Sequence, residues 1–257
     1  MLEPSYIIKF GEPLPEEAFA EKDDLALNVS EFFYGTIQGE GPSIGVPAAF
    51  LRLAGCPVNC EFCDTAEVWR TAKRVKISWL IKQMKETGLA KMLDNRDQIF
   101  VITGGSPLLQ QKMLAEFFKV YETLFQRLPW VEVENECSIK PDLEFARYVS
   151  GWNNSPKLSN SGVPEERRYN PEAMLELLDY PCVYKFVVKD EADWQEIEEK
   201  YIKPGYVRKH SILLMPMGAT QQEYFENREK VVELAVKHGV RYSPREHIAI
   251  WDKKTGI

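Results

Sequence analysis

The chain has 257 residues, is 44% hydrophobic and carries a net charge of −7, with an isoelectric point near 5.3. This acidity argues against a broad nucleic-acid-binding surface, and no apolar run reaches the ~20 residues that a membrane helix needs. An odd number of cysteines, 5 in all, does not favour a disulfide framework. The start, Met1-Leu2-Glu3-Pro4, lacks the pattern of a signal peptide, so we expect a cytoplasmic protein.

The first segment, 1–27, contains several prolines and the charged run Glu21-Lys22-Asp23-Asp24, and we predict an irregular N-terminal extension. The remaining segment, 28–257, is long enough for one α/β domain with its own core. Within it, 28–47 is rich in glycine, and we expect a loop that can approach a ligand closely.

Three cysteines follow the next predicted element. The apolar segment 48–54 predicts a buried strand, after which Cys56, Cys60 and Cys63 occur at the spacing C-x3-C-x2-C. They therefore lie on a loop at the carboxyl end of a strand, where α/β sheets place their chemistry. Thiolates suit zinc, copper(I) or iron–sulfur clusters. Three thiolates without a fourth argue against a closed zinc site, whereas a four-iron cluster would keep one iron open.

Strand and helix patterns alternate through the rest of the chain. Predicted strands cover 98–103, 130–134, 183–188 and 211–217, and predicted helices cover 78–88, 108–128, 171–178, 191–203 and 220–239. This repetition, together with the first strand, indicates a parallel sheet with right-handed crossovers. Periodicity alone does not distinguish a barrel from an open doubly wound sheet.

Further motifs surround the cysteines. Thr36-Ile37-Gln38-Gly39-Glu40-Gly41 precedes the first strand, Phe50-Leu51-Arg52-Leu53-Ala54-Gly55-Cys56 enters the loop, and Cys63-Asp64-Thr65 leaves it. With these motifs the chain, from about Asn28 onward, resembles the 7-carboxy-7-deazaguanine synthase family of the radical S-adenosylmethionine (SAM) superfamily. The resemblance implies a partial (β/α)6 barrel of parallel strands with helices outside.

The resemblance also implies a lyase of queuosine and deazapurine biosynthesis. Such an enzyme converts 6-carboxy-5,6,7,8-tetrahydropterin to 7-carboxy-7-deazaguanine with loss of ammonia. Cys56, Cys60 and Cys63 would hold a [4Fe–4S] cluster, SAM would bind its open iron, and Thr65 would ligate Mg2+. Expected partners are the pterin, an electron donor such as flavodoxin or ferredoxin, and a second copy of the chain in a homodimer; neither nucleic acid nor membrane is expected.

The same resemblance implies which residues would bind the substrate. Gln38 and Glu40 would present acceptors to the N–H groups of the pterin. Arg52 would meet the substrate carboxylate as a bidentate fork, or else form an exposed salt bridge. His247 is a ligand or a structural histidine. The implied substrate-binding set is Gln38, Glu40, Arg52, Thr103 and His247.

Residues on the cofactor side include one departure from the superfamily pattern. Gly104-Gly105-Ser106-Pro107 resembles the Gly-Gly-Glu-Pro motif, in which the glutamate accepts a hydrogen bond from the SAM amino group. Serine keeps acceptor lone pairs, and we predict that Ser106 still contacts the amine. Glu134 and Glu136 are the carboxylates that could support it, and we favour Glu134. The implied SAM-binding set is Gly104, Gly105, Ser106, Glu134, Ser155 and Lys157.

Two other interpretations remain at this stage. Another radical SAM enzyme, such as a glycyl-radical activase, would share the cysteines but not the segment 36–41. A structural zinc module would be the interpretation without catalysis, and it would need a fourth ligand. The remaining thiols, Cys137 and Cys182, are expected to be small buried side chains.

Overall fold

Six parallel strands form the centre of the structure, a computed structural model that describes residues 3–256. In chain order, each of these strands pairs with the one that follows it. The two-residue strand β10 (Arg241–Tyr242) pairs in parallel with the last of the six. They are β3 (Pro47–Leu53), β5 (Ile99–Gly104), β6 (Val131–Asn135), β7 (Gly151–Asn154), β8 (Cys182–Val188) and β9 (Ile212–Pro216). The predicted α/β class with a parallel sheet is therefore confirmed.

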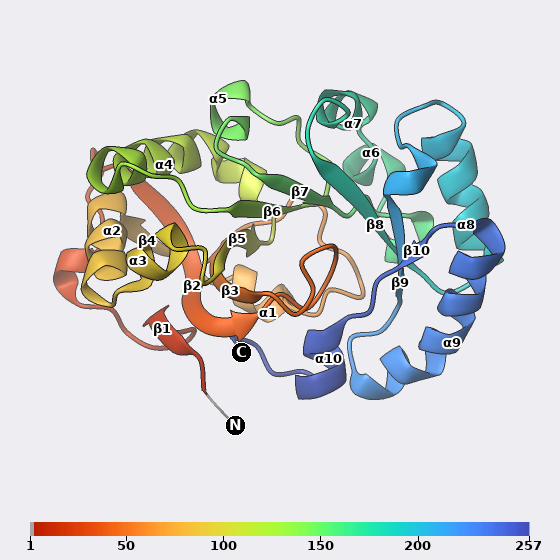
Figure 1. Ribbon diagram of the computed structural model, residues 1–257, viewed down its shortest axis with the longest axis horizontal. Coiled ribbons are helices and arrows are strands. Elements are labelled where there is room, and N and C mark those ends of the chain that lie inside the picture. The colour runs from red at the N-terminus through yellow and green to blue at the C-terminus, as the bar shows by residue number, and fades with distance from the viewer. Residues whose placement is uncertain (1–2, 257) are drawn as a thin grey trace.

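Helices cover the outer side of this curved sheet, whereas α1 (Ala66–Trp69) and α10 (Glu246–Trp251) lie toward its inner side (Figure 1). The outer helices are α2 (Ile77–Glu86), α3 (Leu89–Asp94), α4 (Gln111–Phe125), α5 (Leu143–Ala146), α6 (Glu165–Arg168), α7 (Pro171–Leu177), α8 (Glu191–Ile197) and α9 (Gln221–His238). Strands that are covered on both faces are largely apolar, as in β5, where 99–102 are all buried hydrophobic residues. Among the described residues, the strand order runs from β1 to β10 without closing, so the sheet is a partial barrel.

An antiparallel edge precedes the parallel strands. Strand β2 (Ala26–Ile37) pairs antiparallel with β3, β1 (Ser5–Ile8) and β4 (Lys73–Lys76). Within 28–47 the predicted glycine-rich loop begins only after Ile37, because 28–37 belongs to β2. The pattern concealed β2 because nearly every side chain of 26–33 is buried, including Glu31, so no alternation of apolar and polar residues appears.

The N-terminal segment is more ordered than predicted. Within 1–27, strand β1 joins the sheet and a short 3-10 turn forms at Glu16–Ala18, so the segment is not wholly irregular. Tyr6 of β1 donates a hydrogen bond to the Gly256 carbonyl at 2.6 Å, which joins the two ends of the described chain. The proposed boundary at 27/28 falls inside β2, and the division into extension and domain stays a prediction.

The ends of the helices agree only in part with those predicted from the sequence. The predicted helix 220–239 is α9, and a capping box of Thr220 and Glu223 fixes its start. The predicted helix 78–88 is α2, which starts one residue earlier, so Ser78 lies inside it rather than at its cap. Gly88 follows the end of α2 in a left-handed conformation, as expected of a glycine that stops a helix, and it also precedes α3. The short elements β7 and α10 were not predicted, because four to six residues carry too little periodicity to be recognised.

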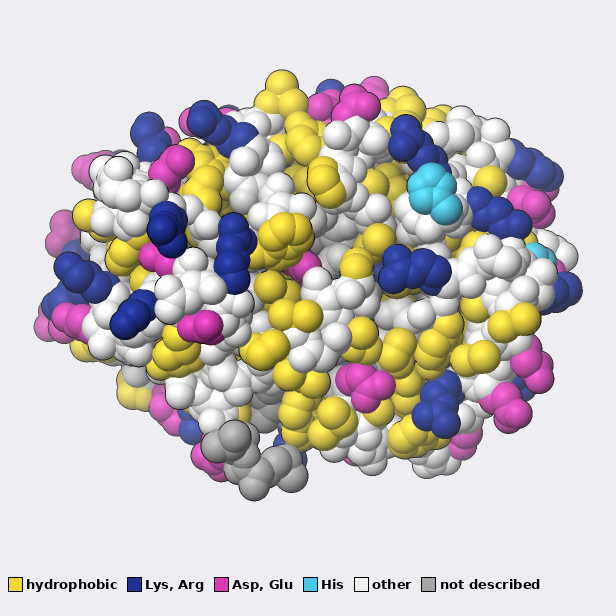
Figure 2. Space-filling view, viewed as in Figure 1, with side chains coloured by type: hydrophobic (Ala, Val, Ile, Leu, Met, Phe, Trp, Pro, Cys, Tyr) yellow, Lys and Arg dark blue, Asp and Glu magenta, His cyan; other side chains and the backbone are white. Residues whose placement is uncertain are grey.

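Basic and acidic side chains are mixed on the face of the molecule in Figure 2, around apolar side chains that extend through the middle of the view. This face shows no broad basic region. Among residues 3–256, no helix combines the length and apolar character needed to cross a bilayer.

Candidate active site

A pocket of about 260 Å3 lies at the carboxyl ends of the parallel strands. Side chains from β3, β5, β6 and β8 form its wall, and the loop after β2, the cysteine loop and 252–256 complete it. All the predicted site residues except Ser106 line this pocket: Gln38, Glu40, Arg52, Cys56, Cys60, Cys63, Thr65, Thr103, Gly104, Gly105, Glu134, Ser155, Lys157 and His247. The structure therefore brings together segments separated by more than two hundred residues.

The cysteine loop presents three partly buried thiols to the pocket, none of them in a disulfide. Burial raises the pKa of Cys56 and Cys60, so their deprotonation needs a positive partner such as a metal centre. Trp69 donates its indole N–H to the Cys63 sulfur at 3.3 Å. Among the described residues, no three Cys, His, Asp or Glu side chains are gathered around one ion position. In a four-iron cluster each cysteine binds a different iron, so its thiols do not converge on one point.

The Gly-Gly turn after β5 packs directly against the cysteine loop. A Cβ at Gly104 would lie 2.1 Å from the Leu53 carbonyl oxygen, and one at Gly105 would lie 2.1 Å from the Gly55 carbonyl oxygen. The Ser106 amide donates to the same Gly55 oxygen at 2.7 Å. The two glycines are thus required for this close approach of two loops, in addition to any approach to a ligand.

Ser106 and Glu134 lie in different parts of the wall. The Ser106 hydroxyl is fully buried and donates to Glu136 Oε1 at 3.0 Å. Glu134 instead contacts Gln38, Asn153 and Lys185. The carboxylate beside Ser106 is therefore Glu136, and Glu134 lies with the predicted substrate-side residues.

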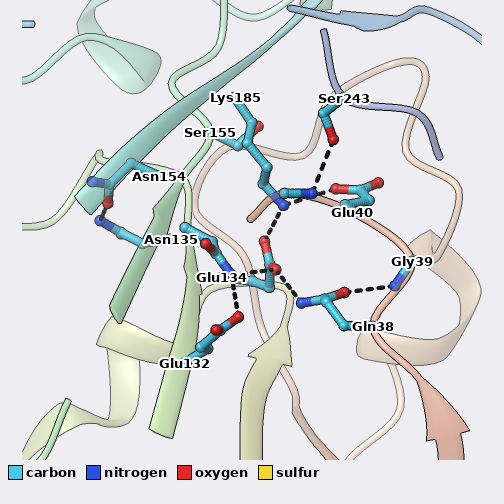
Figure 3. A network of polar contacts seen from close by, with 12 residues as sticks. Gln38, Gly39, Glu40, Glu132, Glu134, Asn135, Asn154, Ser155, Lys185 and Ser243 are labelled. Carbon is cyan, nitrogen blue, oxygen red and sulfur yellow. Dashed lines mark hydrogen bonds and ion pairs between the residues drawn. The ribbon is translucent and has the colours of Figure 1, made fainter. Parts of the chain in front are cut away.

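Lys185 is the centre of a buried charge network (Figure 3). Its ammonium donates to Glu134 Oε2 at 2.6 Å and to Glu40 Oε2 at 2.8 Å. The other oxygen of Glu40 accepts from Arg245 Nε at 3.0 Å, and Arg245 Nη2 reaches Asp64 Oδ2 at 2.6 Å. Two cations and three carboxylates therefore alternate along one side of the pocket.

The two carboxylates on Lys185 differ in their titration. Burial disfavours both charges, but at Glu40 the combined attraction of Lys185, Arg245 and His247 prevails, and its pKa is lowered. Glu134 has Lys185 as its cation and two carboxylates nearby, Glu40 and Glu132, so burial and repulsion leave its pKa raised. Attraction to both carboxylates outweighs burial at Lys185 and raises its pKa. We therefore expect Lys185 and Glu40 to remain charged across the neutral range.

Arg52 forms a buried ion pair rather than an exposed one. Its Nε donates to Glu31 Oε1 at 2.6 Å, and Glu31 is only 1% exposed. Within the described residues, its terminal nitrogens make no hydrogen bond, which leaves the forked end for a ligand. His247 Nε2 lies 3.6 Å from Asp64 Oδ2 and 3.8 Å from Glu40 Oε1, at the end of the charge network.

Thr65, Ser155 and Lys157 also line the pocket. Thr65 is at the N-cap of α1, yet its hydroxyl makes no capping bond. Lys157 donates to both the carbonyl and the hydroxyl of Ser155, at 2.8 and 2.7 Å. The Ser155 amide donates to the Asn135 carbonyl at 2.6 Å, which fixes this turn to the end of β6.

Five charged residues of this region are absent from the predicted site sets: Glu31, Asp64, Glu136, Lys185 and Arg245. Glu136 was weighed as a support for Ser106 but not chosen. Its position two residues after Glu134 was the available signal, because alternation along a strand turns both toward one face. No local pattern marks Arg245 or Glu31, since their partners lie 181 and 21 residues away in sequence.

Comparisons with known proteins agree on one family. A family described as "4Fe-4S single cluster domain" matches residues 37–132. The 7-carboxy-7-deazaguanine synthase of Pyrobaculum aerophilum is 33% identical over 87% of this chain and 94% of its own. The enzyme of that name from Halobacterium salinarum is 29% identical, covering 90% and 92% respectively. The crystal structure of QueE from Escherichia coli superposes with a TM-score of 0.62 at 19% identity, covering 86% of this chain and 94% of that one.

The charge network predicts a pH-dependent effect of Glu40→Gln. The pKa of Glu40 is lower in the folded protein than its ordinary value of 4.5 in an unfolded chain. The ionised Glu40 side chain therefore stabilises the fold at pH values above 4.5, and this stabilisation is lost progressively as the pH falls below 4.5. At pH 7 the variant should be less stable by about 3 kcal/mol, because Lys185 and Arg245 each lose a partner. The difference from the parent, measured by chemical denaturation, should shrink steadily between pH 5 and about 3.

Glu229→Gln is the control, because Glu229 is an exposed residue of α9. Its effect should be small and similar at each pH. A Glu40→Gln effect that stays constant throughout this range would contradict the titration described for Glu40.

Proposed function

The chain belongs to the 7-carboxy-7-deazaguanine synthase family, and we propose that its pocket converts 6-carboxy-5,6,7,8-tetrahydropterin to 7-carboxy-7-deazaguanine with release of ammonia. One observation supports this most: the cysteine triad, the Gly-Gly turn and the polar residues 38–40 share a single pocket. A pocket at the carboxyl ends of parallel strands is also where such folds bind small molecules.

The cysteine loop would hold a [4Fe–4S] cluster through Cys56, Cys60 and Cys63. The donors fit this group, because all three are soft thiols on one partly buried loop. The indole N–H of Trp69 on Cys63 is the kind of contact that tunes a cluster's reduction potential. When bound, the cluster and SAM supply the radical chemistry that removes a hydrogen atom from the substrate.

SAM would bind between the Gly-Gly turn and the turn that follows β7. Gly104 and Gly105 expose backbone groups there, and Ser155 and Lys157 face them from the adjoining wall. The Lys157 ammonium is already held by Ser155, so it offers an oriented positive charge to a carboxylate.

The substrate would bind on the side of the charge network. The remaining lone pairs of Glu40 and Glu134, together with Gln38 and Thr103, suit the N–H donors of a pterin. Arg52 would meet the substrate carboxylate with its terminal nitrogens, while Glu31 fixes the guanidinium from behind. His247 would complete this side, and the buried surroundings would strengthen each of these contacts.

Mg2+ would be ligated by Thr65. Magnesium prefers oxygen ligands and retains several waters, so a single protein hydroxyl is sufficient beside a substrate oxygen. The Thr65 hydroxyl is not used in capping α1, whereas Asp64 is engaged by Arg245. We further propose an electron donor such as a flavodoxin or ferredoxin, and a homodimeric, cytoplasmic enzyme.

Product analysis tests the function. Anaerobically reconstituted protein, given SAM, a reductant and 6-carboxy-5,6,7,8-tetrahydropterin, should release 7-carboxy-7-deazaguanine, detected by mass spectrometry. Replacement of Cys56, Cys60 or Cys63 by Ala should abolish product and the iron–sulfur absorbance, because each removes one cluster ligand. Cys137→Ala and Cys182→Ala are the matched controls and should keep both. Bound zinc in place of iron, or loss of the cluster on replacing Cys137, would contradict the proposal.

A second experiment tests the magnesium site. Turnover of chelator-treated protein should rise when Mg2+ is added, and the response should weaken in Thr65→Ala because one oxygen ligand is lost. The cluster absorbance should be unchanged, which separates this effect from damage to the neighbouring Cys63. Equal turnover with and without Mg2+ would rule out the role given to Thr65.

A further inference from the structure

Glu136 is a buried carboxylate with one satisfied oxygen and one unsatisfied oxygen. The residue is 6% exposed and belongs to the pocket wall. Its Oε1 accepts two hydrogen bonds, from the hydroxyls of Ser106 and Ser138. Its Oε2 is buried and has no hydrogen-bond partner among the described residues.

This arrangement is costly without a ligand. A buried polar atom left without a partner costs about 1–3 kcal/mol, and more when the group is charged. Glu40, Glu134 and Asp64 also line this pocket, and each contacts Lys185 or Arg245, whereas Asp252 at its edge is exposed to solvent. Lys157, the cation of the cofactor side, is turned to Ser155. Glu136 is therefore the carboxylate of the wall whose positive partner is missing from the described chain.

The position of Glu136 indicates which part of the pocket this partner occupies. Ser106 connects it to the cysteine loop, because the Ser106 hydroxyl donates to Glu136 while the Ser106 amide donates to Gly55. Gly105, the preceding residue, lies against Cys56. The unsatisfied carboxylate is thus fixed to the turn that packs on the cysteines, away from the Lys185 network.

We propose that Glu136 Oε2 accepts a hydrogen bond from the α-ammonium group of SAM, and that Ser106 and Ser138 orient the carboxylate for this contact. The inference rests on the proposed function, which brings SAM to this side of the pocket. An ammonium group supplies both the N–H donor and the positive charge that the buried oxygen lacks. Ser106 acts indirectly, because its hydroxyl positions the carboxylate of Glu136, thirty residues later in the sequence.

Binding measurements on the cluster-loaded protein test this directly. Glu136→Gln keeps the size of the side chain and removes its charge. Its SAM dissociation constant, from anaerobic equilibrium dialysis, should rise about tenfold, which corresponds to ~1.4 kcal/mol. Binding of 5′-methylthioadenosine, which has the adenosine part but no ammonium group, should be unchanged. The cluster absorbance should also be unchanged.

Two further variants distinguish a loss of SAM binding caused by the missing contact from one caused by a disturbed fold. Ser106→Ala keeps Glu136 and should weaken SAM binding in the same selective way but by less, because Ser138 still holds the carboxylate. Asp193→Asn neutralises a buried carboxylate of α8 outside the pocket and should leave both ligands unaffected.

Unchanged SAM affinity in Glu136→Gln would overturn the inference. Equal weakening of SAM and 5′-methylthioadenosine would also overturn it, because the residue would then shape the pocket rather than bind the ammonium. If Glu136→Gln did not hold its cluster, an unaltered SAM affinity in Ser106→Ala would overturn it instead. A parent protein that bound the cluster but no SAM would refute the proposed function itself.

Discussion

Lys185 joins two carboxylates that would otherwise repel each other inside the protein. Its ammonium is within 2.8 Å of both Glu40 and Glu134 and is fully buried. A buried charge is tolerated when it is paired and hydrogen-bonded, and removal of one partner leaves the other uncompensated. The three residues come from the loop after β2, from β6 and from β8, so this one contact fixes three walls of the pocket relative to one another.

The remaining charges extend this constraint to the cysteine loop. The Arg245 guanidinium donates to Glu40 and to Asp64, and Asp64 directly follows Cys63. On the opposite side, Ser106 connects the same loop to Glu136 through Gly55. The cysteines therefore lie between two polar systems, one containing paired charges and one containing an unsatisfied carboxylate. This asymmetry supports the proposed division of the pocket into a substrate side and a cofactor side.

Several parts of this arrangement followed from the sequence alone. Three features could be recognised from residues close together in the sequence: the spacing of Cys56, Cys60 and Cys63, the apolar strands around them, and the Gly-Gly turn. Such features do not depend on which distant residues the fold brings together. The parallel sheet also followed, because strands alternating with helices leave few other topologies. Strand β2 did not, since burial on both faces removes the alternation by which a strand is recognised.

The partners of the buried charges could not be predicted in the same way. Lys185 and Glu40 are 145 residues apart, and their meeting depends on the curvature of the sheet and on the register of every strand between them. The prediction that Glu134, rather than Glu136, supports Ser106 failed for the same reason, since the sequence does not show which distant residues meet. Glu134 lies in β6 and Glu136 directly follows its last residue, and this difference of two residues decides whether a side chain meets Lys185 or Ser106.

The stability of Lys185→Met, compared with the same variant carrying Glu40→Gln and Glu134→Gln, tests the central role of this lysine most directly. Chemical denaturation at pH 7 should show a loss of about 3–5 kcal/mol for the single change, because two buried carboxylates then lack their shared cation. The triple variant should recover part of that loss, since neutral amides no longer need the ammonium, although Arg245 still lacks the Glu40 carboxylate. A single variant within about 0.5 kcal/mol of the parent, or a triple variant no more stable than the single one, would contradict this account.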